Sequence, residues 1–278
     1  MSIAFDPRGA GAPRLRAVIF DWAGTLVDHG SRAPVVALQA AFDAEGLDLS
    51  EAQARGPMGL GKRDHIAVLL ADADVAAAWR AVHGETPSAA TVDRLYSGFA
   101  SRLPDAVAGH TQVIRGAVEV VARLRAQGIR IGSTTGYPRS VAAVVAQAAE
   151  GQGLVVDSLA ATDDVPAGRP APWMVLRSME RLDVYPPFLV VKVGDTGVDM
   201  EEGRNAGTWC VGVTETGNEM GLDESALATL SADERGTLAA AAGQRLLASG
   251  AHDVVPSVAD LPGVLAGLEA RLTAGERP

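Results

Sequence analysis

Short apolar runs that end at turn residues recur along the chain, and this pattern predicts buried strands. Four runs have the pattern, at residues 15–21, 129–136, 188–195 and 208–213. Segments with helical spacing separate them, at residues 112–127, 138–150, 172–182 and 198–206. Strands that alternate with helices favour an α/β fold, in which helices cover both faces of a parallel sheet. A last short strand and a final helix are predicted within residues 251–272.

Helical spacing alone marks the region between the first strand and the helix that precedes the second. The helices predicted there cover residues 33–46, 62–82 and 88–103, and Gly46 is the expected stop of the first. Residues from about 31 to 110 carry no strand signal. We therefore expect a Rossmann-like core domain, residues 1–30 and 111–278, with an inserted all-helical cap domain, residues 31–110.

Composition disfavours two classes of partner. The chain has 278 residues, of which 47% are apolar, so it is long enough for a core domain with a smaller insertion. Its net charge is −10 and no run of Lys and Arg forms a basic stripe, which disfavours nucleic acid. No uninterrupted apolar run reaches the length of a membrane span.

The N-terminus and the single cysteine are typical of a cytoplasmic protein. Residues 1–16 lack the apolar core of a signal peptide and are expected to form a loose leader. Cys210 has no second cysteine with which to form an internal disulfide, so it is expected to pack as a small buried residue.

Lysine is rare in this chain. Of its 24 basic residues only Lys62 and Lys192 are lysines, and the rest are arginines. A retained lysine is a candidate for chemistry that arginine cannot perform, namely attack as a neutral amine, although chance would also explain a single case. Lys62 lies in a glycine-rich segment of the predicted cap. Lys192 lies inside a predicted strand, where structural pairing is the better interpretation.

Polar side chains follow four of the predicted strands at their carboxyl ends, where open parallel sheets bind ligands. They include Asp21, Thr135, Arg169 and Asp195. Two carboxylates that converge repel each other unless a cation lies between them, and oxygen ligands suit Mg²⁺. A metal would also let Asp21 approach an anionic phosphoryl group as a nucleophile. A threonine and an arginine could then neutralise the phosphoryl oxygens.

The motifs that carry these residues resemble those of the haloacid dehalogenase superfamily, in the same order along the chain. They are "DWAGTLVD", "STTG", the arginine of "AGRP" and "GDTGVD". The resemblance implies a Rossmann-like core and an aspartyl intermediate. Phosphatases of the superfamily commonly carry a second aspartate, which protonates the leaving oxygen, where this chain has Ala23. The chain is therefore either inactive or suited to a leaving group that needs no proton on oxygen, as in carbon–halogen or carbon–phosphorus cleavage.

The predicted cap offers a way to cleave a carbon–phosphorus bond without that acid. Lys62 opens a predicted helix in "RGPMGLGKRDH", and His65 shares its helical face. A lysine in a dry pocket near other cations has a lowered pKa and can form an imine with an aldehyde. A protonated imine next to the bond accepts the electron pair when phosphorus transfers to Asp21. The absence of an acid at Ala23 and the presence of Lys62 in the predicted cap would then both follow from cleavage through an imine.

The chain closely resembles the phosphonatase branch of this superfamily, from about Arg16 to the C-terminal helix. The motifs that match are "DWAGTLVDHGSRAP", "PMGLGKRDH", "IGSTTGYPR", "TDDVPAGRPAPWM" and "VGDTGVDMEEGRNAG". The resemblance implies hydrolysis of phosphonoacetaldehyde to acetaldehyde and phosphate in 2-aminoethylphosphonate degradation. It also implies a homodimer, although the apolar segment "VVALQAAF" that could form the interface serves a cap core equally well.

The same resemblance implies a set of site residues. Asp21 would be the nucleophile and Lys62 the Schiff-base lysine. Mg²⁺ would be held by Asp21, Asp195 and the backbone carbonyl of Ala23, and the phosphoryl group by Thr135 and Arg169. Leu26 and Ser31 depart from the pattern without affecting this chemistry.

Four further residues have supporting roles with open alternatives. His65 either relays a proton or makes a hydrogen bond near the site. Met58 lines the cap face or packs, and Tyr137 orients a water or packs. Asp199 is expected to accept hydrogen bonds behind the metal rather than to bind it.

Two other readings of the sequence stay open. One is a different enzyme of the superfamily, a phosphatase or a dehalogenase. The other is a protein that binds phosphonates without catalysis. Ala23, in place of the acid, argues against the phosphatase, and the phosphoryl-binding set together with Lys62 argues against the dehalogenase. The retained Asp21 with Lys62 argues against a protein that only binds phosphonates, because such a protein needs no nucleophile.

Overall fold

One sheet of six parallel strands forms the centre of the computed structural model, which describes residues 14–278. The strand order is β3-β2-β1-β4-β5-β6. The strands are β1 (Ala17–Phe20), β2 (Arg130–Thr135), β3 (Ser158–Ala161), β4 (Val190–Gly194), β5 (Trp209–Val213) and β6 (Asp253–Val255). This order confirms the predicted Rossmann-like core. Most of the predicted leader, residues 1–13, lies outside the described residues.

Strand β1 is buried on both faces, as its unbroken apolar sequence predicts. Val18 and Phe20 point into the large core on one side of the sheet, while Ala17 and Ile19 pack with Val175 on the other side. Every residue of β1 is fully buried. The strand therefore needs helices on both faces, and the chain supplies them.

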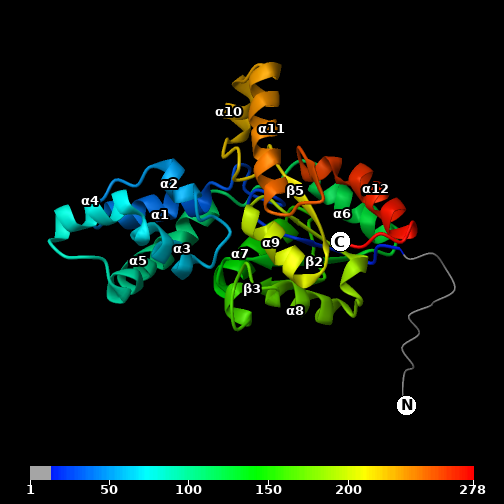
Figure 1. Cartoon of the computed structure of the whole chain (residues 1–278), viewed down its shortest axis with the longest axis horizontal. Coiled ribbons are helices and arrows are strands. Elements are labelled where there is room, and N and C mark those ends of the chain that lie inside the picture. The colour runs from blue at the N-terminus through cyan, green and yellow to red at the C-terminus, as the bar shows by residue number, and fades with distance from the viewer. Residues whose placement is uncertain (1–13) are drawn as a thin grey trace, which may run out of the picture.

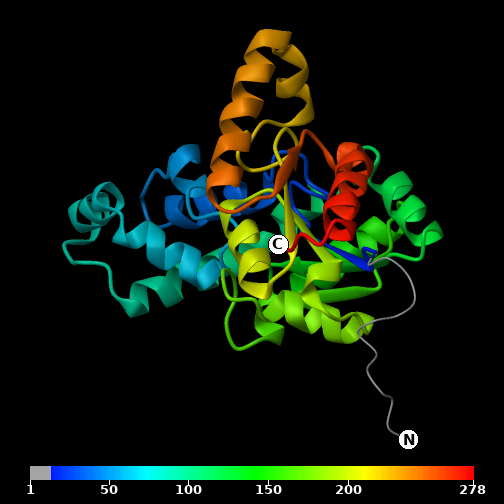
Figure 2. The same cartoon turned by 45° about the vertical axis from the view of Figure 1, so that its right-hand side comes forward.

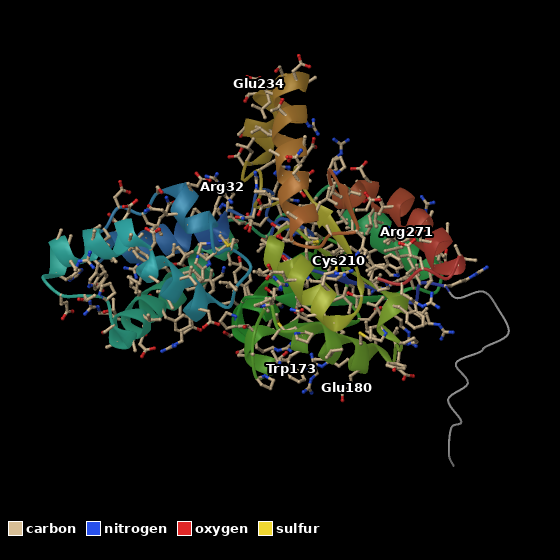
Figure 3. The ribbon with its side chains drawn as sticks, in the orientation of Figure 1. Arg32, Trp173, Glu180, Cys210, Glu234 and Arg271 are labelled. Carbon is tan, nitrogen blue, oxygen red and sulfur yellow. The ribbon has the colours of Figure 1, made fainter. Side chains whose placement is uncertain are left out.

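Helices cover both faces of the sheet (Figures 1 and 2). Those of one face are α8 (Trp173–Leu182), α9 (Gly197–Ala206) and α11 (Ala232–Ala248). Those of the other are α6 (Ala117–Ala126), α7 (Arg139–Glu150) and α12 (Leu261–Thr273). Short 3-10 helices, η1 (Thr162–Asp164), η2 (Pro187–Leu189) and η3 (Val258–Asp260), connect them. Cys210 packs inside this core with Met200 and Leu246, as predicted (Figure 3).

The segment between β1 and α6 is helical and lies to one side of the sheet (Figure 1). Its helices are α1 (Ala33–Asp43), α2 (Glu51–Arg55), α3 (Lys62–Ala71), α4 (Ala73–His83) and α5 (Ala89–Ala108). The apolar side of α1 packs against α5 within this cap. The apolar segment noted in the sequence therefore serves the cap core. The domain boundaries at residues 30 and 110 stay a prediction.

Several helices differ from their predicted bounds. The helical spacing over residues 62–82 belongs to two helices, because the carboxylate of Asp72 accepts hydrogen bonds from the Asp74 and Val75 amides and starts α4. Helix α5 continues beyond residue 103 through Pro104, and Leu103 and Val107 are buried on its inner face. The first cap helix ends at Asp43, ahead of Gly46.

Three helices were not predicted from the sequence, namely α2 of the cap and two helices that project from the core. Helix α10 (Glu224–Thr229) and helix α11 lie side by side, and Glu234 marks the far end of α11 (Figures 1 and 3). Capping residues begin each helix, Asp223 and Ser231. No described helix has the length and apolarity that a membrane span requires.

Candidate active site

The first two carboxylates of the site come from neighbouring strands at the point where the strand order reverses. The amide of Asp21 donates to the carbonyl of Val193 at 2.8 Å, which continues the β1–β4 pairing beyond β1. Asp195 follows the end of β4. The turn after Asp21 needs a glycine, because Gly24 has φ +80° and a Cβ atom there would lie 2.1 Å from Asp195 Oδ2.

One cavity between the cap and the core brings together eight of the ten predicted site residues. These are Asp21, Ala23, Met58, Lys62, Thr135, Tyr137, Arg169 and Asp195. Ser31, Pro34, Gly59, Gly136 and Thr196 complete the lining. The other two predicted residues, His65 and Asp199, are fully buried and do not line the cavity. The cavity therefore joins groups from both predicted domains.

Three buried carboxylates converge at the bottom of the site. Asp21, Asp195 and Asp199 each offer an oxygen, and these oxygens lie within 4.8 Å of one another. Burial raises the pKa of Asp195 well above its ordinary value, and the charges of Asp21 and Asp199 raise it further. Burial also raises the pKa of Asp21. A set of oxygen ligands that repel one another in a dry site fits a hard divalent cation, which would balance their charges.

Arg169 is held among these carboxylates. Its Nη2 donates to Asp21 Oδ1 at 2.6 Å and to Thr134 Oγ1 at 2.8 Å. Its Nη1 lies 3.1 Å from Asp199, and its Nε donates to Glu202 at 3.0 Å. The guanidinium is buried. Burial alone would lower the pKa of Arg169, but the charges of the neighbouring carboxylates raise it well above its ordinary value. Arg169 therefore presents a fixed positive charge to the cavity.

Lys192 lies behind the cavity and pairs with the same acidic groups. Its Nζ donates to Asp199 Oδ1 at 2.7 Å and to Thr134 Oγ1 at 3.0 Å, and it lies 3.6 Å from Glu202 Oε2. Burial alone would raise the pKa of Asp199, but the charges of Arg169 and Lys192 hold it below its ordinary value. The predicted structural pairing of Lys192 is confirmed.

Lys62 is the first residue of α3 and follows Gly61 at the helix start. Its side chain is 5% exposed, and its Nζ donates to Met58 Sδ at 3.3 Å. Burial lowers its pKa from 10.5 to about 8, with Asp21 acting in the opposite direction and Arg169 adding to the decrease. About a tenth of the amine is therefore neutral at pH 7, whereas an exposed lysine is almost entirely protonated, and the neutral form is the one a nucleophilic amine requires.

His65 lies one turn after Lys62 and turns towards the cap backbone. Its Nε2–H donates to the carbonyl oxygen of Ala54 at 3.0 Å. Burial lowers the pKa of His65 well below its ordinary value, and the charge of Lys62 lowers it further, so the ring is neutral. Its Nδ1 has no hydrogen-bond partner among the described residues.

Thr135 and Tyr137 form the core side of the cavity. The Oγ1 of Thr135 accepts a hydrogen bond from the amide of Tyr137 at 3.1 Å. Burial raises the pKa of Tyr137 well above its ordinary value, and nearby carboxylates add to the increase. The phenol therefore stays protonated and can donate one hydrogen bond into the cavity.

Several residues of this site had no role predicted from the sequence. Glu202 and Thr134 contact both Arg169 and Lys192. A signal for Glu202 existed, because it lies three residues after Asp199 and shares that face of α9. Asn218, whose amide donates to Asp195 Oδ2 at 2.8 Å, lies in a loop and carries no such signal.

Comparison with known proteins places this site in a family. The family model for haloacid dehalogenase-like hydrolases matches residues 15–207, which include all ten predicted site residues. Phosphonoacetaldehyde hydrolase of Paraburkholderia phytofirmans is 44% identical over 95% of this chain and 99% of its own length. The chain belongs to the phosphonoacetaldehyde hydrolase family of haloacid dehalogenase-like hydrolases.

Further members of the phosphonoacetaldehyde hydrolase family match over nearly the whole chain. The enzyme of Nitratidesulfovibrio vulgaris is 42% identical over 95% of this chain and 94% of its own length. The solved structure of a phosphonoacetaldehyde hydrolase-like protein from Oleispira antarctica has a TM-score of 0.94 and 42% identity, and the match covers 96% of this chain and 97% of that one. The family likeness therefore includes the cap as well as the sheet.

Proposed function

We propose that this chain hydrolyses the carbon–phosphorus bond of phosphonoacetaldehyde, with water, to acetaldehyde and phosphate. The observation that carries the proposal is the cavity that holds the amine of Lys62 together with the carboxylate of Asp21. The relatives named for this activity support it. The substrate would be supplied by removal of the amino group from 2-aminoethylphosphonate.

Lys62 would activate the substrate first. Its neutral amine adds to the aldehyde carbon, and loss of water gives a protonated imine. Burial of the side chain and the pKa of about 8 support this role, because a neutral amine is available without an added base. Met58, at 3.3 Å, keeps the amine within the cavity without neutralising it by an ion pair.

Asp21 would then attack phosphorus. The new oxygen–phosphorus bond forms as the carbon–phosphorus bond breaks, and the released electron pair moves through the imine to give an enamine. No acid is needed at the leaving carbon in this step, which is consistent with Ala23. Protonation of the enamine and hydrolysis of the resulting iminium release acetaldehyde and Lys62, and a second water releases phosphate from Asp21.

The phosphoryl oxygens carry negative charge during the transfer, so they need a positive charge and hydrogen-bond donors close to them. We assign Arg169 and Thr135 to them, because both line the cavity and the guanidinium already lies 2.6 Å from Asp21. Tyr137 would donate a hydrogen bond at the same wall. His65, neutral and bonded to Ala54, would fix the start of α3.

Mg²⁺ is the cofactor that we propose for the acidic end of the cavity. Asp21, Asp195 and the carbonyl of Ala23 would hold it, and when bound it would neutralise the carboxylates and the phosphoryl group. Asp199 would orient the site through its bonds to Lys192 and Thr196. We also propose a homodimer in the cytoplasm, which sedimentation of the purified protein and fractionation of cells would test.

The deciding experiment is acetaldehyde release from phosphonoacetaldehyde with Mg²⁺, for the intact protein and for Lys62→Arg. Release by the intact protein alone would support an imine on Lys62, since an arginine cannot form one. Equal release by both proteins would exclude the imine. Hydrolysis of a phosphate ester in place of phosphonoacetaldehyde would overturn the proposed substrate.

A further inference from the structure

Helix α2 of the cap contacts the core through one arginine. Arg55 Nη1 donates to the carbonyl of Gly30 at 2.8 Å and to Asn218 Oδ1 at 3.2 Å. Its Nη2 donates to the carbonyl of Gly221 at 2.8 Å. The side chain is only 12% exposed, so these bonds are largely shielded from water. They connect the cap to the core outside the cavity.

Asn218 makes the reciprocal contact and also bonds to a carboxylate of the site. Its Nδ2 donates to the carbonyl of Arg55 at 3.4 Å, and its backbone amide donates to Asp195 Oδ2 at 2.8 Å. The carbonyl of Arg55 also accepts from the amide of Met58 at 3.0 Å, at the start of the loop that leads to Lys62. One core residue therefore touches both the cap backbone and a carboxylate of the site.

The loop that carries Asn218, residues 214–221, is itself held in place. The Oγ1 of Thr216 donates to the carbonyl of Gly24 at 2.8 Å, and the carbonyl of Thr216 accepts from the amide of Gly30 at 2.7 Å. Helix α11 holds the same loop through Arg245, which pairs with Glu219 at 2.5 Å. The core therefore presents Asn218 to the cap in a fixed position.

The shape of the contact requires an arginine. Gly221 has φ +67°, and a Cβ atom at that position would lie 2.6 Å from Arg55 Nε, so a larger residue there would clash with the arginine side chain. Glu51 accepts from the Nη2 of Arg55 at 2.7 Å and fixes the plane of the group. Lysine would keep the charge but could not make the forked set of bonds.

We propose that Arg55 and Asn218 are positioning residues that hold the cap against the core, with Lys62 in the cavity opposite Asp195. The catalytic part of this inference rests on the proposed function, whereas the cap–core contact does not. Neither side chain lines the cavity. Their loss should therefore change how often the cap is closed, while the chemistry in the closed state is retained.

Amide hydrogen exchange of residues 56–62 tests the contact without any substrate. Arg55→Lys and Asn218→Ala are the variants, and Asn218→Ala keeps the backbone amide that donates to Asp195. The control is Arg63→Ala, which removes an exposed ion pair with Asp93 inside the cap. Exchange should accelerate about tenfold or more in both variants, the scale expected for loss of a shielded bond to a charged group, and stay unchanged in the control. Exchange at the intact protein's rate in both variants would overturn the contact.

Steady-state kinetics on phosphonoacetaldehyde test the catalytic part. KM should rise by about tenfold in both variants, because substrate must close the cap, while kcat falls by much less. The effect of the double variant should be smaller than the sum of the two single effects, since Arg55 and Asn218 share hydrogen bonds, while Arg55 also bonds to Gly30 and Gly221. A fall in kcat at unchanged KM would overturn the positioning role. If the intact protein does not turn over this substrate, the proposed function fails, and the exchange result still decides the contact.

Discussion

The amine of Lys62 lies 3.3 Å from the sulfur of Met58, inside a cavity that shields both side chains. A thioether is a weak acceptor, so it offsets little of the cost of removing an ammonium group from water. Lys192 is buried as well, but its Nζ lies 2.7 Å from a carboxylate oxygen of Asp199. The two lysines of this chain therefore differ in their surroundings, because Lys192 is paired with a carboxylate and Lys62 is next to a thioether. We expect replacement of the two lysines to have opposite effects on stability.

The pH dependence of imine formation follows from the surroundings of Lys62. Burial lowers its pKa to about 8, so the neutral, reactive fraction increases as pH rises and levels off above that value. Below the pKa, the rate of imine formation should rise about tenfold per pH unit. Borohydride reduction of the imine in single turnovers, followed by mass measurement of the adduct, gives this rate. A rise that continues to the ordinary lysine pKa of 10.5 would contradict it.

Lys62→Met should stabilise the protein at pH 7. The lysine pKa is 10.5 when exposed and about 8 in the fold, so folding is penalised while the amine is protonated in the unfolded chain. The penalty is about 3 kcal/mol at pH 7 and decreases as pH rises from about 8 to above 10. Urea unfolding of both proteins at several pH values measures it. An advantage of the variant that does not shrink at high pH would contradict the assignment.

Lys192→Met should have the opposite effect. Its removal leaves Arg169 as the one remaining cation paired with the buried Asp199 and Glu202 among the described residues, although methionine fills a similar volume. Loss of one partner of a buried ion pair costs about 3–5 kcal/mol. Urea unfolding at pH 7 measures the change, and Arg63→Ala, which breaks an exposed pair, should cost less than about 1 kcal/mol. Equal stability of Lys192→Met and the intact protein would refute this prediction.

The strands and the residues at their ends could be predicted because each predicted strand of the site has two signals in the sequence, an apolar run and a polar residue at its end. An apolar run such as residues 17–20 predicts a buried strand, and Asp21 then stands at the edge where parallel strands present ligands. Arg169 and Lys62 could be predicted from the motifs that contain them, "AGRP" and "PMGLGKRDH". Each of these signals is local in the sequence.

Contacts between distant segments left no such signal. Asn218 lies in a loop, and its link to Arg55 depends on how the cap is placed on the core. The separation of α3 from α4 depends on whether Asp72 caps a helix, and the same residue type is also common on exposed helix faces. Helix α11 is rich in alanine and largely exposed, so its sequence has little amphipathic pattern to reveal it.

Asp195→Asn should leave the metal-free protein as stable as the intact one or more stable, and should make it less stable than the intact protein when Mg²⁺ is present. Burial and the charges of Asp21 and Asp199 raise the pKa of Asp195, so its ionised form destabilises the metal-free fold at neutral pH. Because stability from such a group increases as pH falls, a neutral asparagine should be equally stable or more stable without metal. It can still accept the 2.8 Å bond from the Asn218 amide. Mg²⁺ should raise the melting temperature of the intact protein, because a ligand that binds only the folded state stabilises it.

Scanning calorimetry across a Mg²⁺ titration measures both effects without substrate. The melting temperature of the intact protein should rise with Mg²⁺ concentration, whereas that of Asp195→Asn should stay nearly constant. Glu180→Gln, at an exposed site of α8 that does not line the cavity, serves as the matched control and should respond like the intact protein (Figure 3). An equal rise in Asp195→Asn would remove Asp195 from the proposed metal ligands. A metal-free variant much less stable than the intact protein would mean that the Asp195 carboxylate stabilises the fold through its own bonds.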